Sequence, residues 1–369
     1  MSLERTSTGA WRVRWREAGR NRAKVVGTKA DARLFDAEVT RRQRMGELST
    51  LDAGKVTLDA FARETWWPQH VRPNLERSTR ESYAGTWDRH ISRNLGGYPL
   101  REITAPIVRR WADDLIAAGV GRQAVRRAKA VLQSCLSRAV EAGLIQGNPA
   151  QSVRPPRIEQ QARVQAIGPG DIERLRAALN PRDAALVSVL AYAGLRPGEA
   201  LALRWSDIGA ATVLVERAND DGQVKRTKTG RARSARLMAP VRADLRAWRL
   251  ASGRPGDDAL VFPKPGGGAW REHDWRNWRR TKFQPAARAL GLDIRRPYDL
   301  RHAAVSLALH EGRSVVEVAA WLGHSPAMAL STYAHVVEEL RGSPQIDAEE
   351  AIRQARAQHV PAINEATAP

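Results

Sequence analysis

The first residues of the chain alternate between hydrophobic and basic positions. Residues 11–16 read WRVRWR, and this period of two is typical of a strand with one buried and one exposed face. Residues 18–21 favour a turn, and residues 23–26 favour a second strand. Thr28 predicts the cap of a helix over about 29–48. The pattern therefore predicts a small sheet packed on one helix, with arginines on the outer face of the sheet.

From Val56 to Gly147, apolar residues recur every three to four positions, which is the period of an amphipathic helix. Tyr83, Trp87 and Ile91 lie four residues apart and predict one buried face. A further helix is predicted over 122–142. Its outward basic residues are expected to be Arg126, Arg127, Lys129 and Arg138. The interpretation is a four-helix unit with tryptophans in its core.

Residues 151–165 have no apolar period and contain a Pro–Pro pair, which indicates an interdomain linker. Helical and strand-like runs alternate after it. The expected helices are one that follows 169–171 and runs to about 179, then 184–192, 240–251 and a tail helix over 347–358, and the expected strands are 212–217, 224–226, 233–237 and 260–262. Residues 219–222 predict a turn between the first two of these strands, and residues 224–237 predict a basic hairpin, with Lys228 beside its turn. Residues 270–291 suit contact with a DNA groove and phosphates, or form an amphipathic helix with tryptophans in the core, or both.

The predicted fold class is therefore multidomain, mainly α with small β-sheets. We expect a small sheet plus helix at 1–50, a helical domain at 56–150, a linker at 151–165, a mixed α+β domain at 166–342 and a tail helix within 343–369. An apolar stripe on the tail helix could dock on a neighbouring subunit or pack on its own domain. The stripe consists of Ile346, Ala351, Ile352 and Ala355.

Composition narrows the class of protein. The 369 residues carry a net charge of +20, and 43% of them are hydrophobic. Such an excess of positive charge indicates a polyanionic partner, with nucleic acid well ahead of a membrane; the alternative is a generically basic soluble protein. The single cysteine, Cys135, excludes a disulfide within the chain. We find neither a secretory signal nor an apolar run of ~18 residues, so we expect a cytoplasmic, nucleoid-associated protein.

Two stretches carry candidate chemistry. Residues 193–207 read AGLRPGEALALRWSD, with Glu199 three positions after Arg196. Residues 297–333 read PYDLRHAAVSLALHEGRSVVEVAAWLGHSPAMALSTY. Arg301 and His302 begin a predicted helix there, and His324 follows a glycine that ends the next helix. Tyr333 comes nine residues after His324, at the end of another short helical run.

These motifs resemble the catalytic domain of the tyrosine recombinases, the phage-integrase class of site-specific DNA recombinases. The family pattern is G-L-R-x-x-E, a lysine on a β-hairpin, H-x-L-R-H, L-G-H and a tyrosine nine residues on. The chain matches it over roughly 166–342 and departs at Tyr298, where the family usually has a histidine. By organisation alone, 1–50 resembles an arm-type DNA-binding domain, and 56–150 resembles the helical, SAM-like core-binding domain.

The resemblance implies a role for each site residue. Tyr333 would attack phosphorus and form a 3′-phosphotyrosyl bond, while Arg196 and Arg301 hold the non-bridging oxygens. His324 would donate a further hydrogen bond to the phosphate, and Lys228 would protonate the leaving 5′ oxygen. No metal or other cofactor is expected. The partners would be two recombination sites in double-stranded DNA, a tetramer of this chain on DNA, and accessory DNA-bending or directionality proteins.

Three further residues belong to the same candidate site. Glu199 would orient Arg196 or a histidine. Tyr298 would donate a hydrogen bond, because a phenol is a poor base until its pKa of ~10 is lowered. His302 would either face the cleft next to Arg301 or brace the start of its helix.

Basic residues outside the site are candidates for DNA contact, although a solvated surface explains them as well. They are Arg12, Arg14 and Arg16 on the first strand, Arg126 and Arg127 on a helix, and Arg276, Arg279 and Arg280 in a stretch rich in tryptophan. Two other functions share much of this pattern: a DNA-binding protein that has lost catalysis, and a relaxase like the type IB topoisomerases.

Overall fold

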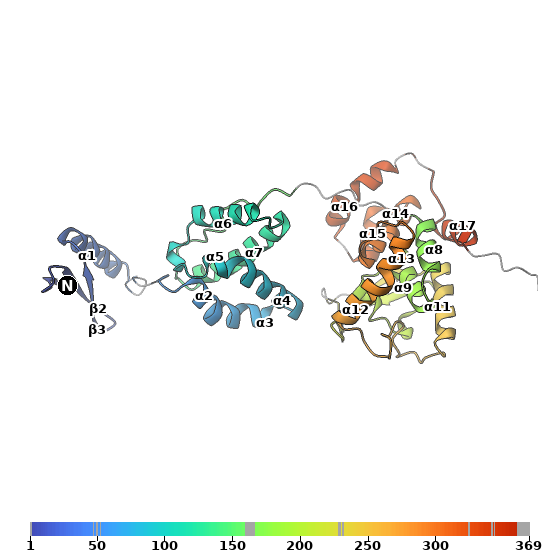
Figure 1. The fold of residues 1–369 in the computed structure, drawn as a ribbon, viewed down its shortest axis with the longest axis horizontal. Coiled ribbons are helices and arrows are strands. Elements are labelled where there is room, and N and C mark those ends of the chain that lie inside the picture. The colour runs from blue at the N-terminus through green and yellow to red at the C-terminus, as the bar shows by residue number, and fades with distance from the viewer. Residues whose placement is uncertain are drawn as a thin grey trace, which may run out of the picture. The chain divides into compact units, whose positions relative to one another are not determined.

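The computed structural model describes residues 2–46, 48, 51, 53–158, 167–227, 230, 232–323, 325–340, 342 and 344–359. The chain divides into two compact units, Met1–Gln161 and Ala162–Pro369. Both contain more helix than strand (Figure 1), which agrees with the predicted fold class. Among the described residues, no helix is both long and apolar enough to cross a bilayer.

An antiparallel sheet opens the first unit, with its strands in the order β1 (Ser2–Arg5), β2 (Trp11–Glu17) and β3 (Arg20–Val26). The predicted strands are confirmed as β2 and β3, and β3 begins directly after a tight turn at Ala18–Gly19, where both residues have positive φ. β1 was not predicted, because its residues are exposed throughout and show no alternation.

Helix α1 (Lys29–Arg44) packs on one face of this sheet (Figure 1). Val13 and Trp15 are buried, and the Trp15 ring meets that of Phe35 edge-on, with the centroids 5.6 Å apart. Thr28 caps the helix as predicted, since its side chain accepts the backbone N–H of Asp31. The helix ends at Arg44, four residues before the predicted end at 48.

Four helical segments make up the rest of the first unit, as predicted. They are 58–74, formed by α2 (Leu58–Phe61), η2 (Ala62–Val71) and α3 (Arg72–Asn74); 77–95, formed by α4 (Arg77–Thr86), η3 (Trp87–Ser92) and α5 (Arg93–Leu95); α6 (Ala105–Ala117); and α7 (Arg122–Glu141). A 3₁₀ turn, η4 (Leu100–Glu102), precedes α6. Both η2 and η3 are π-helical, and η2 contains Pro68. Proline has no N–H for the regular helical ladder, which accounts for a wider turn there.

The tryptophans of this helical part lie in its core. Trp66, Trp87 and Trp111 are buried, and the rings of Trp66 and Trp87 are 5.2 Å apart. Lys129 was predicted to point outward, but this is wrong. Its side chain is buried and its Nζ lies 3.3 Å from Oε1 of Gln133, which lets a long aliphatic stem pack in the core while the amine keeps a partner.

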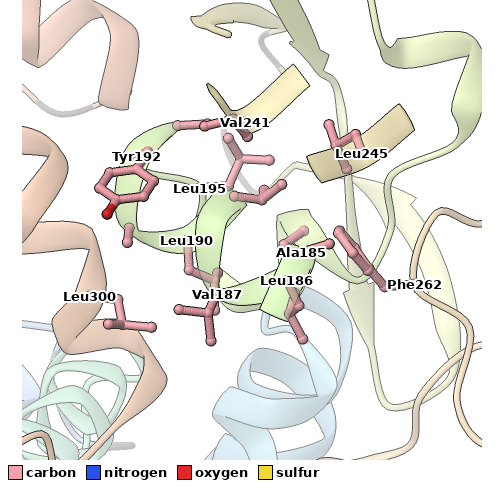
Figure 2. Packing of buried hydrophobic residues seen from close by; sticks show 14 of the residues in the cluster. Ala185, Leu186, Val187, Leu190, Tyr192, Leu195, Val241, Leu245, Phe262 and Leu300 are labelled. Atoms are coloured by element: carbon pink, nitrogen blue, oxygen red, sulfur yellow. The ribbon is translucent and has the colours of Figure 1, made fainter. Parts of the chain in front are cut away.

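The second unit is built around α9 (Pro181–Tyr192), which is buried along most of its length. Its apolar residues pack against Val241 and Leu245 of α11 (Ala239–Ala251), against Phe262 and against Leu300 (Figure 2). The elements around α9 are α8 (Pro169–Ala177), α10 (Pro197–Ala200), η5 (Trp205–Asp207), α11 (Ala239–Ala251), α12 (Glu272–Trp278), η6 (Arg279–Phe283), α13 (Gln284–Ala289), η7 (Pro297–Leu300), α14 (Arg301–His310), α15 (Val315–Leu322) and α16 (Pro326–Glu339).

The strands of the second unit pair differently from the prediction. The outer pair joins β4 (Thr212–Val215) to β7 (Arg233–Arg236), while β5 (Arg217–Asp220) and β6 (Gln223–Arg226) form a hairpin between them. The hairpin predicted over 224–237 is therefore wrong, and the strand predicted over 212–217 ends at Val215. The strands predicted at 224–226 and 233–237 are confirmed as β6 and β7, and the turn predicted at 219–222 joins β5 to β6. The sequence contains two turn-like stretches, at 219–222 and 228–230, and which strands pair across them depends on the tertiary core.

Two other predicted elements have clear outcomes. The strand expected at 260–262 is wrong, since Leu260 forms only an isolated bridge with Arg204. The tail helix is confirmed as α17 (Ala348–His359). It packs on α8 and α11 of its own unit, with Ala348 and Ile352 in the core. Arg356 anchors it further, since Nη2 lies 2.6 Å from Oδ2 of Asp244. In this structure, the stripe thus packs on its own domain.

Candidate active site

Helix α10 begins at the arginine of the G-L-R-x-x-E motif. Arg196 is the N-cap residue and Glu199 is the third residue of the helix. Oε2 of Glu199 accepts the backbone N–H of Arg196 at 2.8 Å, and Oε1 accepts Nη1 of the same arginine at 2.9 Å. Glu199 is buried, whereas the side chain of Arg196 remains 37% exposed. The carboxylate therefore holds an arginine that still reaches the surface.

Arg301 lies deeper, at the first position of α14, and is 1% exposed. Its Nη1 donates to the carbonyl of Gly194 and its Nη2 to the carbonyl of Leu322. Burial, together with the charge of Arg196, lowers the pKa of Arg301 to about 10. Gly194 has φ +65°, and a Cβ there would lie 2.6 Å from Cδ2 of Leu322. Glycine at this position thus permits the close packing that brings the two arginines to one site.

Glu199 carries the negative charge among these arginines. Oε2 of Glu199 lies 3.9 Å from Nη1 of Arg301. Burial raises the pKa of Glu199, but hydrogen bonds and charge from Arg233 and Arg196 outweigh it and keep the pKa below its ordinary value. The carboxylate is therefore ionised at neutral pH.

Tyr333 and His302 meet near Arg301. Nδ1 of His302 lies 2.6 Å from Oη of Tyr333. Tyr333, on α16, is 2% exposed, and burial raises its pKa to about 12, although the charge of Arg301 acts in the opposite direction. Burial also lowers the pKa of His302. A neutral imidazole accepting the phenol proton is the arrangement that fits both shifts.

Tyr298 lies in η7 beside this pair. Its ring is edge-on to that of His302, with the centroids 6.0 Å apart. It is also close enough to act on the pKa of both Arg301 and Tyr333. The residue that departs from the family pattern is therefore part of the same cluster.

Two candidates, Lys228 and His324, lie outside the described residues. The described residues that precede them are Thr227, which follows β6, and Gly323, which follows α15. Lys228 belongs to the segment between β6 and β7, and His324 follows Gly323, which ends α15 in the left-handed conformation with φ +64°. Of the predicted site, the structure thus brings together Arg196, Glu199, Tyr298, Arg301, His302 and Tyr333.

Comparison with known proteins agrees with these motifs. Residues 166–339 match the Phage integrase family, and residues 61–116 match the phage integrase N-terminal SAM-like domain. The chain belongs to the phage integrase family of tyrosine recombinases. It is 28% identical over 293 residues to the integrase of Mycobacterium phage L5, an alignment that covers 75% of each chain. It is also 28% identical over 299 residues to tyrosine recombinase XerC of Mycobacterium sp. (strain JLS), covering 76% of this chain and 93% of that protein.

A solved structure of the Tn1549 transposon integrase in complex with transposon right end DNA is also similar. The TM-score is 0.64 at 16% identity, and the match covers 78% of this chain and 97% of that one. The likeness shows that this phage integrase family member shares the fold. Within its described residues, no group of three or more His, Cys, Asp or Glu side chains is placed to hold a metal ion.

Sequence reasoning missed Arg233, the first residue of β7. Its Nη1 and Nη2 donate to the two oxygens of Glu199 at 2.9 and 2.6 Å, so that this arginine belongs to the cluster. A signal was present, because strand alternation places Arg233 on the same face as Ala235, which is buried. Several arginines in the same stretch concealed it.

The candidate DNA-binding residues lie at the surface of their elements. Arg14 and Arg16 are exposed on β2, and Arg12 is half-buried. Arg126 and Arg127 are exposed on α7. On α12 and η6, Arg276 and Arg280 are exposed, Arg279 is half-buried, and the neighbouring rings of Trp275 and Trp278 stack at 4.6 Å. These tryptophans pack in the core of the second unit.

Proposed function

We propose that this chain is a site-specific DNA recombinase of a phage or mobile element, which cuts and rejoins DNA through a 3′-phosphotyrosyl intermediate at Tyr333. The observation that carries the proposal is the contact of 2.6 Å between Nδ1 of His302 and Oη of Tyr333, next to the buried guanidinium of Arg301. A phenol whose pKa is about 12 is a weak nucleophile at neutral pH. An adjacent neutral base is the feature that activates it.

In the cleavage step, Oη of Tyr333 forms a bond to phosphorus and its proton passes to Nδ1 of His302. The bond between phosphorus and the 5′ oxygen breaks, and that oxygen takes a proton, for which we assign Lys228 as the donor. Arg196 and Arg301 stabilise the charge that grows on the non-bridging oxygens. The phosphodiester energy is conserved in the phosphotyrosine, so that a 5′ hydroxyl of the second duplex can reverse the step without ATP or metal.

The remaining parts of the chain serve DNA binding in this proposal. Residues 1–50 act as an arm-type domain through Arg12, Arg14 and Arg16, and residues 56–150 act as a core-binding domain through α7. Residues 166–342 form the catalytic domain. Exchange between two duplexes breaks four strands, and each chain supplies one nucleophile, so the working assembly is a tetramer on DNA. Accessory proteins that bend DNA or set direction belong to the same proposal, as does action in the cytoplasm at the nucleoid.

Covalent capture tests the proposal directly. Wild-type protein is mixed with random genomic fragments and denatured, and DNA that stays bound is sequenced. Tyr333→Phe removes the nucleophilic oxygen and little packing, so non-covalent binding should persist and the adduct should vanish. Tyr192→Phe is the matched control, because it removes a buried phenol oxygen that bonds to Glu173 at 2.7 Å instead.

The outcomes separate the competing functions. An adduct that persists in Tyr333→Phe, or maps to Tyr298, would contradict the assigned nucleophile. No adduct with wild-type protein, despite binding, would favour a DNA-binding protein without catalysis. Joining of two captured sites would support a recombinase, whereas relaxation of supercoiled plasmid without joining would support a relaxase.

A further inference from the structure

The last turn of α15 receives an arginine donor at each of three successive carbonyls. Nε of Arg233 donates to Trp321 at 2.9 Å, Nη2 of Arg301 donates to Leu322, and Nη2 of Arg196 donates to Gly323 at 3.2 Å. Carbonyls at a helix C-terminus lack partners within the helix and carry partial negative charge, so cations stabilise them. The three arginines together therefore fix the turn that leads directly into position 324.

The carboxylate of Glu199 lies close to the same three arginines. Its Oε1 accepts from Arg196 and Arg233, both at 2.9 Å, and its Oε2 accepts from Arg233 at 2.6 Å. Arg233 is the one of the three that engages both carboxylate oxygens with its side chain. Such a two-pronged contact fixes orientation as well as position. Its side chain is 13% exposed, compared with 37% for Arg196.

Arg233 also joins β7 to the end of α15, which lies far along the chain. It opens β7, where it pairs with Val215, and lies five residues after Lys228. The side chain of Arg233 also lies against Gly323. A Cβ at Gly323 would be 3.2 Å from Cδ of Arg233 and 3.3 Å from its Nε. The fit leaves no room for a larger residue at the end of α15 without movement of this guanidinium.

We propose that Arg233 is a positioning residue for DNA cleavage. It holds Glu199 and the end of α15 so that Arg196 and Arg301 present their guanidinium groups to the scissile phosphate. This proposal rests on the function proposed above. In this proposal Arg233 does not act on the substrate directly, because each of its side-chain nitrogens already has a protein partner: Nε donates to the carbonyl of Trp321, and Nη1 and Nη2 donate to Glu199.

The test compares Arg233→Lys with Arg236→Lys. The control arginine lies on the same strand and pairs with Glu311, which is not part of the cluster. Lysine keeps the charge but cannot make the two-pronged contact. The probe is a nicked duplex carrying a sequence that wild-type protein captures covalently. For Arg233→Lys we expect binding within about threefold of wild type and single-turnover cleavage about 100-fold slower, as for a small misplacement of catalytic groups. For Arg236→Lys we expect cleavage within about threefold.

A chemically altered substrate separates positioning from general loss of structure. A methylphosphonate at the scissile position replaces one non-bridging oxygen by a methyl group and makes the linkage neutral, so a misplaced arginine matters less. The ratio of wild-type to Arg233→Lys rates should therefore shrink at least about tenfold on this substrate. An unchanged ratio would overturn the proposal. Rescue only by a 5′-thiolate leaving group, which needs no proton, would also overturn it, because the defect would then lie with Lys228.

The controls keep this inference distinct from the proposed function. If wild-type protein forms no adduct that Tyr333→Phe abolishes, the proposed function fails. If wild-type protein cleaves and Arg233→Lys cleaves equally fast, only the positioning role fails. Thermal denaturation of each variant identifies a loss of fold, and Arg233→Gln provides a second variant if lysine proves unstable. A slow Arg233→Gln variant that keeps the wild-type melting temperature and shows methylphosphonate rescue would support the proposal, and absence of that rescue would overturn it.

Discussion

Replacing His302 by glutamine tests the base beside the candidate nucleophile. Glutamine is similar in length and can hydrogen-bond to Tyr333, but it cannot take up the phenol proton. With a pKa of about 12, ionising Tyr333 at pH 7 requires about 7 kcal/mol. A positioned general base typically contributes ~10²–10⁴-fold in rate. We therefore expect single-turnover cleavage by His302→Gln to be at least about 100-fold slower than by wild type, with little change in binding.

The pH dependence should distinguish this mechanism from a structural defect. The pKa of His302 is lowered by burial, so wild-type cleavage should be nearly level at neutral pH and fall below the ordinary histidine pKa of ~6.5. In His302→Gln the rate should instead rise about tenfold per pH unit toward the pKa of Tyr333. The lowered pKa also means that stability decreases as pH falls from ~6.5 through the folded-state pKa, because the unfolded chain then binds more protons.

The assay is cleavage of a nicked duplex bearing a captured sequence, resolved on a denaturing gel across a pH series. His310→Gln, at the other end of α14, is the matched control and should cleave at close to the wild-type rate. A rate for His302→Gln within about threefold of wild type, or a pH profile parallel to that of wild type, would refute the assignment of His302 as the base.

The other predictions concern charge, the unusual tyrosine, the tail and metal. Glu199→Gln should lower the free energy of unfolding by about 3 kcal/mol or more, because it leaves buried arginine charge uncompensated; in wild type this stabilisation should be lost as pH falls through the lowered pKa of Glu199, and urea unfolding measures both. Tyr298→His should keep or raise the cleavage rate at neutral pH, and a tenfold loss, about 1.4 kcal/mol of barrier, would indicate a site rebuilt around the phenol. Ile352→Ala should destabilise the second unit by about 2–5 kcal/mol, against little change for the exposed Val316→Ala, and equal melting temperatures would contradict the packing of α17. Cleavage should proceed in EDTA, and strict dependence on magnesium would contradict the proposed chemistry.

Much of the fold follows from the hydrophobic pattern because its helices are long and periodic. The strand with alternating tryptophan and arginine and the four-helix part appeared where the sequence predicts them. Strand pairing did not, because β4 and β7 are matched by a shared core around Val213 and Ala235, which local sequence does not reveal. Lys129 shows the same limit, since a lysine on a helix is normally exposed and only its neighbours decide otherwise.

The site was predictable in its residue types but not in its connections. The motifs identify Arg196, Glu199 and Arg301, yet spacing alone does not show that one carboxylate serves several arginines. The contact between His302 and Tyr333 joins residues 31 positions apart, so only the folded chain decides between a base and a brace for the helix. Arg233 was not predicted as part of the site, because its role depends on contacts with α15, which lies far along the chain.

The burial of Tyr333 has a consequence for how the protein rests between reactions. At 2% exposure, the phenol lies among Val305, Val318 and Val336 and cannot meet a bulky duplex phosphate until α16 or its surroundings shift. If Tyr333 is the nucleophile, DNA that binds without causing this shift should therefore remain uncut. The same burial should protect the phenol from nitrating or iodinating reagents. Tyr333 that stays unmodified would therefore indicate the buried state, and modification of Tyr333 would indicate that it has become exposed.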